Sequence, residues 1–306
     1  MRVITDNDFA GDPDGLFQLA HLLLSHSVET RAIIGSHLNA TDGFDRSGMQ
    51  AANAVKKVKE LLDVMGIPQD SIPVIQGSNV AMINDSTPVK SAAVDFIIKE
   101  ALRTDTDLPL YVLCGAGLTE IASALLTEPR IANKLTLVWI GGAEYTDIAI
   151  PPPNFSSPEY NLNIDIFAAR HIFNKSSVPI WQIPRNVYRQ ALISYATLLD
   201  RVKSKGKTGT YLVNALENVM QLLKNHKLNM GETYILGDSP LVLFTALQSG
   251  FEADPSSSDY VLKMTPGIDE RGNYIFSHTG RTIRVYTRTD NYAMFEDFFS
   301  KIKLAR

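Results

Sequence analysis

The chain has 306 residues, of which 45% are apolar and 20% charged, and its formal net charge is −4. This length is enough for one large α/β domain or two smaller ones with a sizeable core. No basic stripe is visible, which argues against a nucleic-acid partner, and no apolar run approaches the roughly 18 residues needed to cross a bilayer. Met1 leads directly into RVITD rather than into a signal peptide, so we expect a cytoplasmic protein.

The sequence contains a single cysteine, Cys114, which excludes an internal disulfide and is compatible with a reducing compartment. It lies in the apolar, strand-like run LPLYVLC. We therefore interpret it as a buried structural thiol rather than a nucleophile.

Strand-like and helix-like segments alternate through the first two thirds of the chain. Short apolar or β-rich runs predict strands at 2–6, 30–37, 72–77, 108–117, 135–142 and 178–184. Apolar residues at helical spacing predict helices at 16–25, 46–65, 91–103, 118–126 and 166–174. This alternation indicates βαβ units, and the continuous apolar character of the strands indicates a mostly parallel sheet with helices on both faces.

Three stretches are predicted to lie outside this rhythm. Residues 149–158 (AIPPPNFSSP) form a Pro/Ser-rich loop, and residues 201–210 (RVKSKGKTGT) a solvated surface turn. Residues 267–273 (GIDERGN) are typical of a hairpin turn between β-rich runs. Because the sequence shows no internal repeat and no linker, we expect one α/β domain over 1–306, with an open, mostly parallel sheet flanked by helices.

The most informative segment follows the first predicted strand, where DNDFAGDPDG carries four carboxylates within nine residues. Open parallel sheets bind ligands at such a place, the carboxyl end of a strand that leads into a helix. Asp6 and Asp8 are two residues apart and therefore point to the same side of an extended backbone. A helix N-terminus can stabilise one or two of these charges but not easily four. An all-oxygen ligand set without His or Cys is typical of Ca²⁺ or Mg²⁺.

Two other interpretations use the same residues. Asp12 and Asp14 could cap the helix that starts near Leu16, with the other two carboxylates solvated. An Asp-x-Asp motif after a first strand also fits an aspartyl-phosphate enzyme of the haloacid dehalogenase type. That chemistry needs a downstream Lys and a second acidic pair after a later strand. The later strand ends, GAG and GGAEY, do not supply them convincingly.

The acidic loop resembles the signature of the nucleoside hydrolase family, D-x-D-x-G-x-D-D, in the variant with two extra residues before its last acidic position. The resemblance continues in order along nearly the whole chain. It includes the family's central block at 114–145, its Glu-Phe-Asn-x-x-x-Asp block at 158–173 and its His-Asp-Pro block at 237–247. The resemblance implies a single α/β domain, a tightly held Ca²⁺ in preference to Mg²⁺, and hydrolysis of the bond between ribose and base.

Position by position, the resemblance implies that Asp8 is both a metal ligand and the base that takes a proton from the attacking water. Asp14 would be the second carboxylate ligand, although the two-residue insertion leaves Asp12 and Asp14 interchangeable. Asp238 and the backbone carbonyl of Gly115 would complete the metal shell. Substrate contacts are expected from residues that match the family's sugar-binding positions or lie near them in sequence, namely Asp12, Asn154, Glu159, Asn161 and His37.

The chain departs from the family pattern on the leaving-group side. Many members carry a His just before the late metal-binding Asp, where it helps to protonate a departing purine, and this chain has Gly237 there. His37, after the second predicted strand, is placed to approach the site and could supply a proton instead. Arg185 and Tyr188 follow the sixth predicted strand and could line the pocket.

The implied function is that of a metal-dependent hydrolase that cleaves the N-glycosidic bond of a nucleoside or related pentoside, using a carboxylate-activated water on the metal. The alternative is a nucleoside- or sugar-binding protein of the same fold with weak or no catalysis. The expected partner is a small molecule, with neither nucleic acid nor membrane involved. The oligomeric state is left open, with a homo-oligomer among the options.

Overall fold

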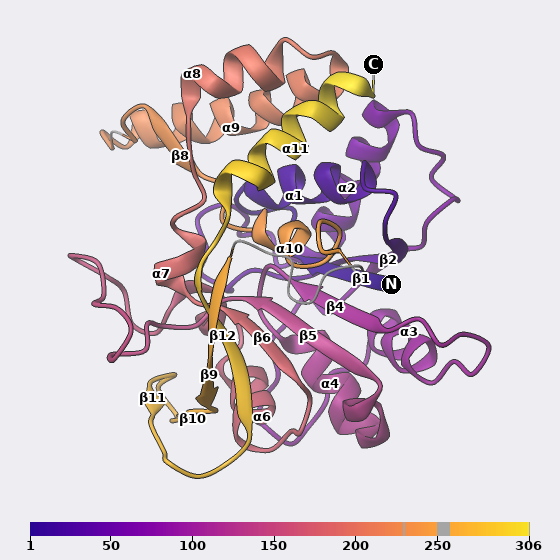
Figure 1. The fold of residues 1–306 in the computed structure, drawn as a ribbon, viewed down its shortest axis with the longest axis vertical. Helices are drawn as coiled ribbons and strands as arrows, with labels where there is room; N and C mark the ends of the chain where they lie inside the picture. Colours follow the sequence, from indigo (N-terminus) through magenta and orange to yellow (C-terminus); the bar gives the residue numbers. More distant parts are fainter. Residues whose placement is uncertain (229, 250–257, 306) are drawn as a thin grey trace.

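β1 (Arg2–Asn7) lies inside an eight-stranded sheet, in the computed structural model that describes residues 1–228, 230–249 and 258–305. The strand order is β3-β2-β1-β4-β5-β6-β12-β9 (Figure 1). Every neighbouring pair is parallel except β12 with β9, which is antiparallel. The other strands of this sheet are β2 (Glu29–Gly35), β3 (Val74–Gln76), β4 (Leu110–Cys114), β5 (Leu135–Ile140), β6 (Ile180–Ile183), β9 (Asp259–Met264) and β12 (Thr282–Arg288).

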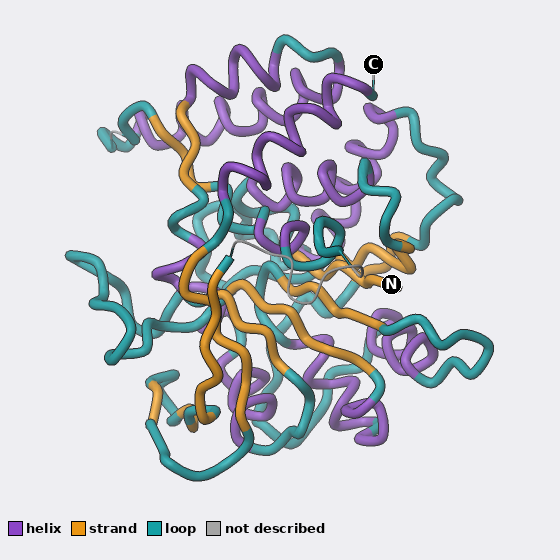
Figure 2. The backbone as a smooth tube through the Cα atoms, in the orientation of Figure 1, coloured by secondary structure: helices purple, strands orange, loops and turns teal. Residues whose placement is uncertain are grey.

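Helices cover both faces of the sheet, and Figure 2 shows the two helical groups on opposite sides of the strands. One layer contains α1 (Asp14–Leu23), α2 (Gln50–Met65), α9 (Lys207–Asn225), α10 (Pro240–Leu243) and α11 (Asn291–Leu304). The other contains α3 (Ala92–Ala101), α4 (Thr119–Thr127) and α6 (Ile166–Asn174). The remaining described elements are η1 (Pro129–Asn133), α5 (Tyr160–Ile164), α7 (Arg185–Tyr188), α8 (Tyr195–Leu198), η2 (Leu199–Lys203), β7 (Leu192–Ser194), β8 (Thr233–Ile235), β10 (Gly267–Ile268) and β11 (Tyr274–Ile275).

The sheet separates two hydrophobic cores, because successive residues of a strand point to opposite faces. In β1, Val3 packs into the core under α1 and Ile4 into the core under α4. In β5, Val138 and Trp139 divide in the same way. Continuous apolar strands are therefore required here, because both sides of each central strand are buried.

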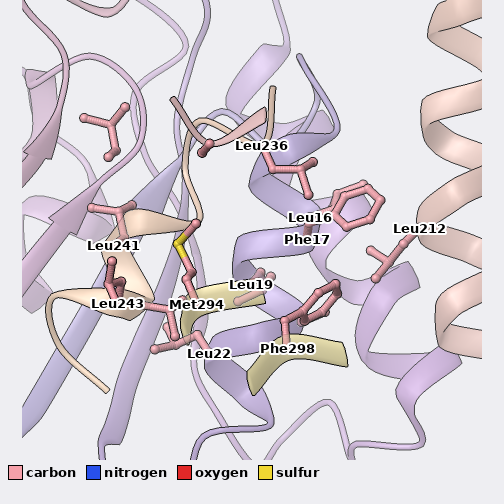
Figure 3. Close-up of a cluster of buried hydrophobic side chains, with 14 of the residues drawn as sticks. Leu16, Phe17, Leu19, Leu22, Leu212, Leu236, Leu241, Leu243, Met294 and Phe298 are labelled. Carbon is pink, nitrogen blue, oxygen red and sulfur yellow. The ribbon is translucent and has the colours of Figure 1, made fainter. Parts of the chain in front are cut away.

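The first core is centred on α1, which is buried along most of its length. Figure 3 shows Leu16, Phe17 and Leu19 of this helix among side chains that come from four later segments. Burial of each such side chain stabilises the fold by about 1.5–3 kcal/mol. The later contributors labelled there are Leu212, Leu236, Leu241, Leu243, Met294 and Phe298. This packing holds the start of α1, and therefore the acidic loop before it, in a fixed position.

The predicted fold class, an open and mostly parallel sheet flanked by helices, is confirmed. The predicted hairpin is also present, as β10 and β11 pair with Gly267 opposite Ile275. Cys114 is fully buried at the end of β4, as interpreted from the sequence. Burial raises the pKa of its thiol well above its ordinary value, with Asp6 and Glu120 adding to the effect.

Two predicted segments, the surface turn at 201–210 and the helix at 46–65, differ from the structure as follows. The stretch at 201–210 is only partly a turn, because η2 extends to Lys203 and α9 begins at Lys207. The basic side chains there misled the prediction, since a helix tolerates them on its exposed face. The helix predicted from Arg46 begins at Gln50. Within the described residues, no helix combines the length and apolar character that a membrane crossing requires.

Candidate active site

A cavity of about 270 Å³ opens at the carboxyl end of β1. Its walls come from segments far apart in sequence: the acidic loop, the ends of β4 and β5, α7 and the turn between β8 and α10. The lining residues are Asp8, Asp12, Asp14, Phe44, Gly115, Ile140, Glu159, Tyr160, Asn161, Tyr188, Ile235, Gly237 and Asp238. The parallel sheet explains this convergence, because the carboxyl ends of its strands lie along one edge.

Asp12 and Asp14, which the sequence left interchangeable, have different environments. Asp14 is the first residue of α1, and its Oδ2 accepts a hydrogen bond from the backbone N–H of Asp238 at 3.2 Å. Asp12 accepts two hydrogen bonds at Oδ1, from the backbone N–H of Asp14 at 3.2 Å and from the hydroxyl of Tyr234 at 2.7 Å. Asp14 is therefore the carboxylate tied directly to Asp238, while Asp12 is held by Tyr234.

Asn7, a residue that the sequence analysis does not predict, links Asp8 of the acidic loop to Asp238. Its Nδ2 donates to Asp238 Oδ2 at 2.8 Å, and its Oδ1 accepts from the backbone N–H of Asp8 at 2.9 Å. A Cβ at Gly115 would lie 2.4 Å from Asn7 Nδ2, and one at Gly15 would lie 2.9 Å from the same atom. Both glycines are thus required by the close packing around this buried amide.

The electrostatics of the cluster are unfavourable for four ionised carboxylates. Burial raises the pKa of Asp8 well above its ordinary value, and the charges of Asp238 and Asp12 raise it further. Burial and the same neighbours also raise the pKa of Asp14. Burial raises the pKa of Asp238 to about 7, against the hydrogen bond from Asn7, which lowers it. Among the described residues that line the cavity, no Lys, Arg or His offsets these charges.

The part of the cavity lining that comes from α5 and α7 is polar. Glu159 is the N-cap of α5, and its Oε2 accepts from the backbone N–H groups of Leu162 at 3.1 Å and Gly142 at 2.7 Å. Its Oε1 accepts from the hydroxyl of Tyr188 at 2.8 Å. Asn161 donates through Nδ2 to the carbonyls of Gly115 at 3.1 Å and Ile140 at 2.8 Å. Glu159 and Asn161 therefore share the cavity lining with the acidic cluster, and the resemblance implies sugar contacts for both.

Two predicted substrate contacts lie outside the lining. His37 is buried, with Nδ1 2.8 Å from the carbonyl oxygen of Leu38 and Nε2 3.0 Å from Thr119 Oγ1. Both ring nitrogens therefore have protein partners. Asn154 is exposed in the loop before Glu159 and has a positive φ of 58°. An Asn tolerates this left-handed backbone conformation better than most residues, which accounts for it without a ligand.

Arg185, which the sequence left as a possible pocket residue, is not among the lining residues. Its guanidinium makes a buried bidentate pair with Glu144, at 2.8 Å and 2.6 Å, and donates to the carbonyl of Ser156 at 2.8 Å. It also lies over the ring of Phe155, 5.2 Å from the centroid. Arg185 thus fixes the Pro/Ser-rich loop that leads to Glu159.

The oxygen atoms at the acidic end of the cavity match the ligands of a hard divalent cation. The carboxylates of Asp8, Asp14 and Asp238 and the carbonyl of Gly115 are all oxygen donors, the type that Ca²⁺ and Mg²⁺ prefer. Burial and, to a lesser extent, mutual repulsion raise the pKa values of the three carboxylates, and a bound cation would stabilise their ionised forms. Among the residues that the structure describes, no three His, Cys, Asp or Glu side chains converge closely enough to form a ligand set by themselves. The donor types and the acidic character of the lining fit a hard cation, although the described side chains do not by themselves form a closed ligand set.

The whole chain was compared with known proteins. Residues 3–296 match the family model described as inosine-uridine preferring nucleoside hydrolase. The chain belongs to this family. As a family member it is an N-glycoside hydrolase, and its fold agrees with that assignment. No curated protein sequence matches the chain.

Solved structures share the fold at low sequence identity. A purine-preferring ribonucleoside hydrolase from Gardnerella vaginalis is 21% identical with a TM-score of 0.76, and the match covers 100% of this chain and 99% of that one. An inosine-guanosine nucleoside hydrolase is 14% identical with a TM-score of 0.74, covering 99% of this chain and 98% of that one. The type III effector protein XopQ, solved with adenosine diphosphate ribose, is 14% identical with a TM-score of 0.69, covering 100% and 94%.

Proposed function

We propose that this nucleoside hydrolase cleaves the N-glycosidic bond of a nucleoside or related pentoside in the cavity at the end of β1, with a divalent cation held by its aspartates. One observation carries the proposal. Asp8, Asp14 and Asp238, three carboxylates with raised pKa values and no cationic neighbour among the described lining residues, share one cavity with Glu159 and Asn161. A cation site beside polar groups of this kind is suited to hold a sugar.

The ligands of the cation would be Asp8, Asp14, Asp238 and the carbonyl of Gly115, with Ca²⁺ ahead of Mg²⁺. Mg²⁺ demands near-ideal octahedral geometry, whereas Ca²⁺ accepts six to eight oxygens in flexible arrangements. When bound, the cation supplies Lewis acidity that makes a water molecule easier to deprotonate near neutral pH.

Asp8 would act as the base. It takes a proton from the attacking water as the oxygen of that water bonds to the anomeric carbon. The bond from that carbon to the leaving group (the nucleobase of a nucleoside) breaks, and its electron pair departs with the leaving group. Positive charge that develops on the sugar is stabilised by the carboxylates around it. Sugar hydroxyls bound by Asp12, by Asn161 and by the part of the lining that Glu159 organises would hold the anomeric carbon against the water, so that binding energy is converted into orientation.

Protonation of the leaving group is the step with no assigned residue. Gly237 has no side chain, and His37 is engaged with Leu38 and Thr119 away from the lining. We therefore leave His37 and Asn154 out of the proposed site. The proposal predicts an enzyme that works best when the leaving group needs no proton from the protein.

The test is a panel of nucleosides and p-nitrophenyl pentosides, assayed with and without a chelator. We expect turnover that the chelator abolishes and added Ca²⁺ restores. Turnover that persists unchanged in chelator would overturn the role of the cation. Binding of nucleosides with no cleavage of either class would favour a binding protein of the same fold.

A further inference from the structure

The carboxylate of Glu159 is only 1% exposed and already has three protein donors. Oε2 is occupied by two backbone N–H groups, and Oε1 receives the hydroxyl of Tyr188 at 2.8 Å. A substrate hydroxyl that approaches this wall therefore meets the phenol oxygen of Tyr188 beside Glu159. A phenol has one donor and can also accept, so this oxygen still has accepting capacity.

Tyr188 also reaches the acidic side of the cavity. It is the last residue of α7, which follows β6, and it is part of the cavity lining. A Cβ at Gly237 would lie 3.4 Å from Tyr188 Cδ2 and 3.3 Å from Asp14 Oδ2. One tyrosine ring thus extends from the residue before Asp238 to the carboxylate of Glu159, and it narrows the space available to a side chain at position 237.

The polar side chains of this wall have their own donors committed to protein acceptors. Asn161 uses both N–H groups on backbone carbonyls, and Tyr160 donates to Asp42 Oδ2 at 2.6 Å. The proton of Tyr188 is committed to Glu159, and burial together with that carboxylate raises the pKa of Tyr188 well above its ordinary value. The described wall therefore presents acceptors to a ligand, and the matching ligand groups are hydroxyl donors.

We propose that Tyr188 is a specificity-determining residue whose phenol oxygen accepts a hydrogen bond from one hydroxyl of the pentoside while its own O–H continues to donate to Glu159. The inference rests on the proposed function, because it assigns one contact within the same site. It excludes Tyr188 as the proton source for the leaving group. It also assigns Glu159 an indirect role, in which its charge orients the phenol.

The decisive experiment couples a substrate hydroxyl to the phenol. Wild type and Tyr188→Phe are assayed with p-nitrophenyl β-D-ribofuranoside and with its 2-, 3- and 5-deoxy analogues. In wild type, removal of the hydroxyl that Tyr188 contacts should lower kcat/KM by about 10–100-fold, as expected for a hydrogen bond in a charged network. In Tyr188→Phe, removal of the same hydroxyl should lower kcat/KM by less than about 3-fold. Removal of either of the other two hydroxyls should change kcat/KM as much as it does in wild type.

Tyr145→Phe is the matched control. The Tyr145 hydroxyl is also buried and also donates to a side-chain oxygen, Gln182 Oε1, at 2.7 Å, but it lies outside the cavity lining. This variant should discriminate among the three deoxy substrates as wild type does. Loss of discrimination in both variants would show that any lost phenol produces the effect and would overturn the proposal.

A binding measurement separates the inference from the proposed function. Pseudouridine, in which a carbon–carbon bond replaces the N-glycosidic bond, and its deoxy analogues are titrated calorimetrically into both proteins. The same hydroxyl should lose its contribution to affinity in Tyr188→Phe. If wild type cleaves pentosides but each hydroxyl contributes equally in both proteins, the role of Tyr188 is wrong and the proposed function stands. If wild type neither cleaves nor binds any member of the panel, the proposed function fails and this inference fails with it.

Discussion

At the scale of single residues, the proposed function gives Asp8 two roles, as a ligand of the cation and as the general base. Replacing it by Asn keeps the shape of the side chain but removes its basicity and weakens it as a ligand. We expect Asp8→Asn to lower kcat by at least about 10²–10⁴-fold, the usual contribution of a general base. Steady-state kinetics at saturating Ca²⁺ check this, and near-normal turnover would transfer the base role to another carboxylate.

The same variant should be no less stable than wild type in chelator. Asp8 is buried beside other carboxylates that raise its pKa, so a neutral amide relieves repulsion in the folded state. Asp63→Asn, on the exposed side of α2, is the matched control and should change neither kcat nor the unfolding midpoint. A large loss of stability in Asp8→Asn would mean that its kinetic defect reports misfolding.

A second residue-scale prediction concerns Gly237, which offers no acid beside Asp238. A purine that leaves as an unprotonated anion is a high-energy leaving group, whereas p-nitrophenolate departs without help. We expect natural purine nucleosides to be hydrolysed more slowly than the p-nitrophenyl riboside, by roughly the 10²–10⁴-fold that a general acid supplies. A comparison of kcat values for inosine and the riboside measures this. Comparable values would reveal a proton donor that the lining residues do not account for.

Individual residues also show where sequence reasoning reached its limit. Asp8, Asp12, Asp14 and Asp238 line one cavity as the motif resemblance implied, because strand ends of a parallel sheet converge. Asn7 was missed because nothing local distinguishes its amide, whose partner lies 231 positions away. A signal was nevertheless present, since it stands between two aspartates of the motif and shares their strand end.

At the scale of elements, α1 and α11 are joined by a titratable contact. His21 of α1 is buried, and its ring lies 2.8 Å from Asp297 of α11, which also pairs with Lys301. Burial lowers the pKa of His21 below 6.5, and the charge of Lys301 lowers it further, against the hydrogen bond and charge of Asp297. The ring is therefore neutral in the folded protein under conditions where the unfolded chain begins to bind a proton.

The sign of the pH effect follows from this difference. Below about pH 6.5 His21 binds more protons in the unfolded state than in the folded state, so the contribution of this residue to the unfolding free energy falls as the pH falls. His21→Gln removes the titrating group while retaining an amide donor toward Asp297. Denaturant unfolding should show that a change from about pH 7.5 to about pH 5.5 lowers the unfolding free energy of wild type relative to that of this variant. An equal difference in both proteins would assign the acid sensitivity to other groups.

In the first two thirds of the chain, the sequence predicts elements where it shows either helical spacing or a continuous apolar run. The strands at 135–142 and 178–184 enclose β5 and β6, because buried parallel strands read as continuous apolar runs. The short elements between 185 and 203 were missed, since four- and five-residue helices such as α7, α8 and η2 contain too few turns to show a period. Their positions are set by tertiary packing instead.

At the scale of the whole molecule, the proposed cation site would couple cation binding to folding. Its proposed ligands lie directly after β1, at the start of α1, directly after β4 and in the turn before α10, so the unfolded chain cannot present them together. A ligand that binds only the folded state stabilises it, by about 2.7 kcal/mol at a concentration about 100 times its Kd. We expect Ca²⁺ to raise the unfolding midpoint of wild type after chelator treatment.

Asp238→Asn provides the comparison for this prediction, since it removes one ligand charge and leaves a side chain of the same size. Its Ca²⁺-dependent shift in Tm should be clearly smaller than that of wild type at the same cation concentration. Scanning calorimetry gives both values without an activity assay. A wild-type midpoint that does not respond to Ca²⁺ or Mg²⁺ would remove the basis for a cation in this cavity.

The bond between Asn7 and Asp238 also has a consequence for how the protein is made. β1 is the first strand to be synthesised, and its partners β2 and β4 are complete by residue 114. At about 5–20 residues per second, residue 238 follows residue 7 by roughly 10 to 50 seconds. A nascent chain can therefore assemble much of its sheet while the catalytic pocket still lacks a wall. Hydrolytic competence is acquired late in translation, when the segment containing Asp238 docks onto a sheet that is already largely built.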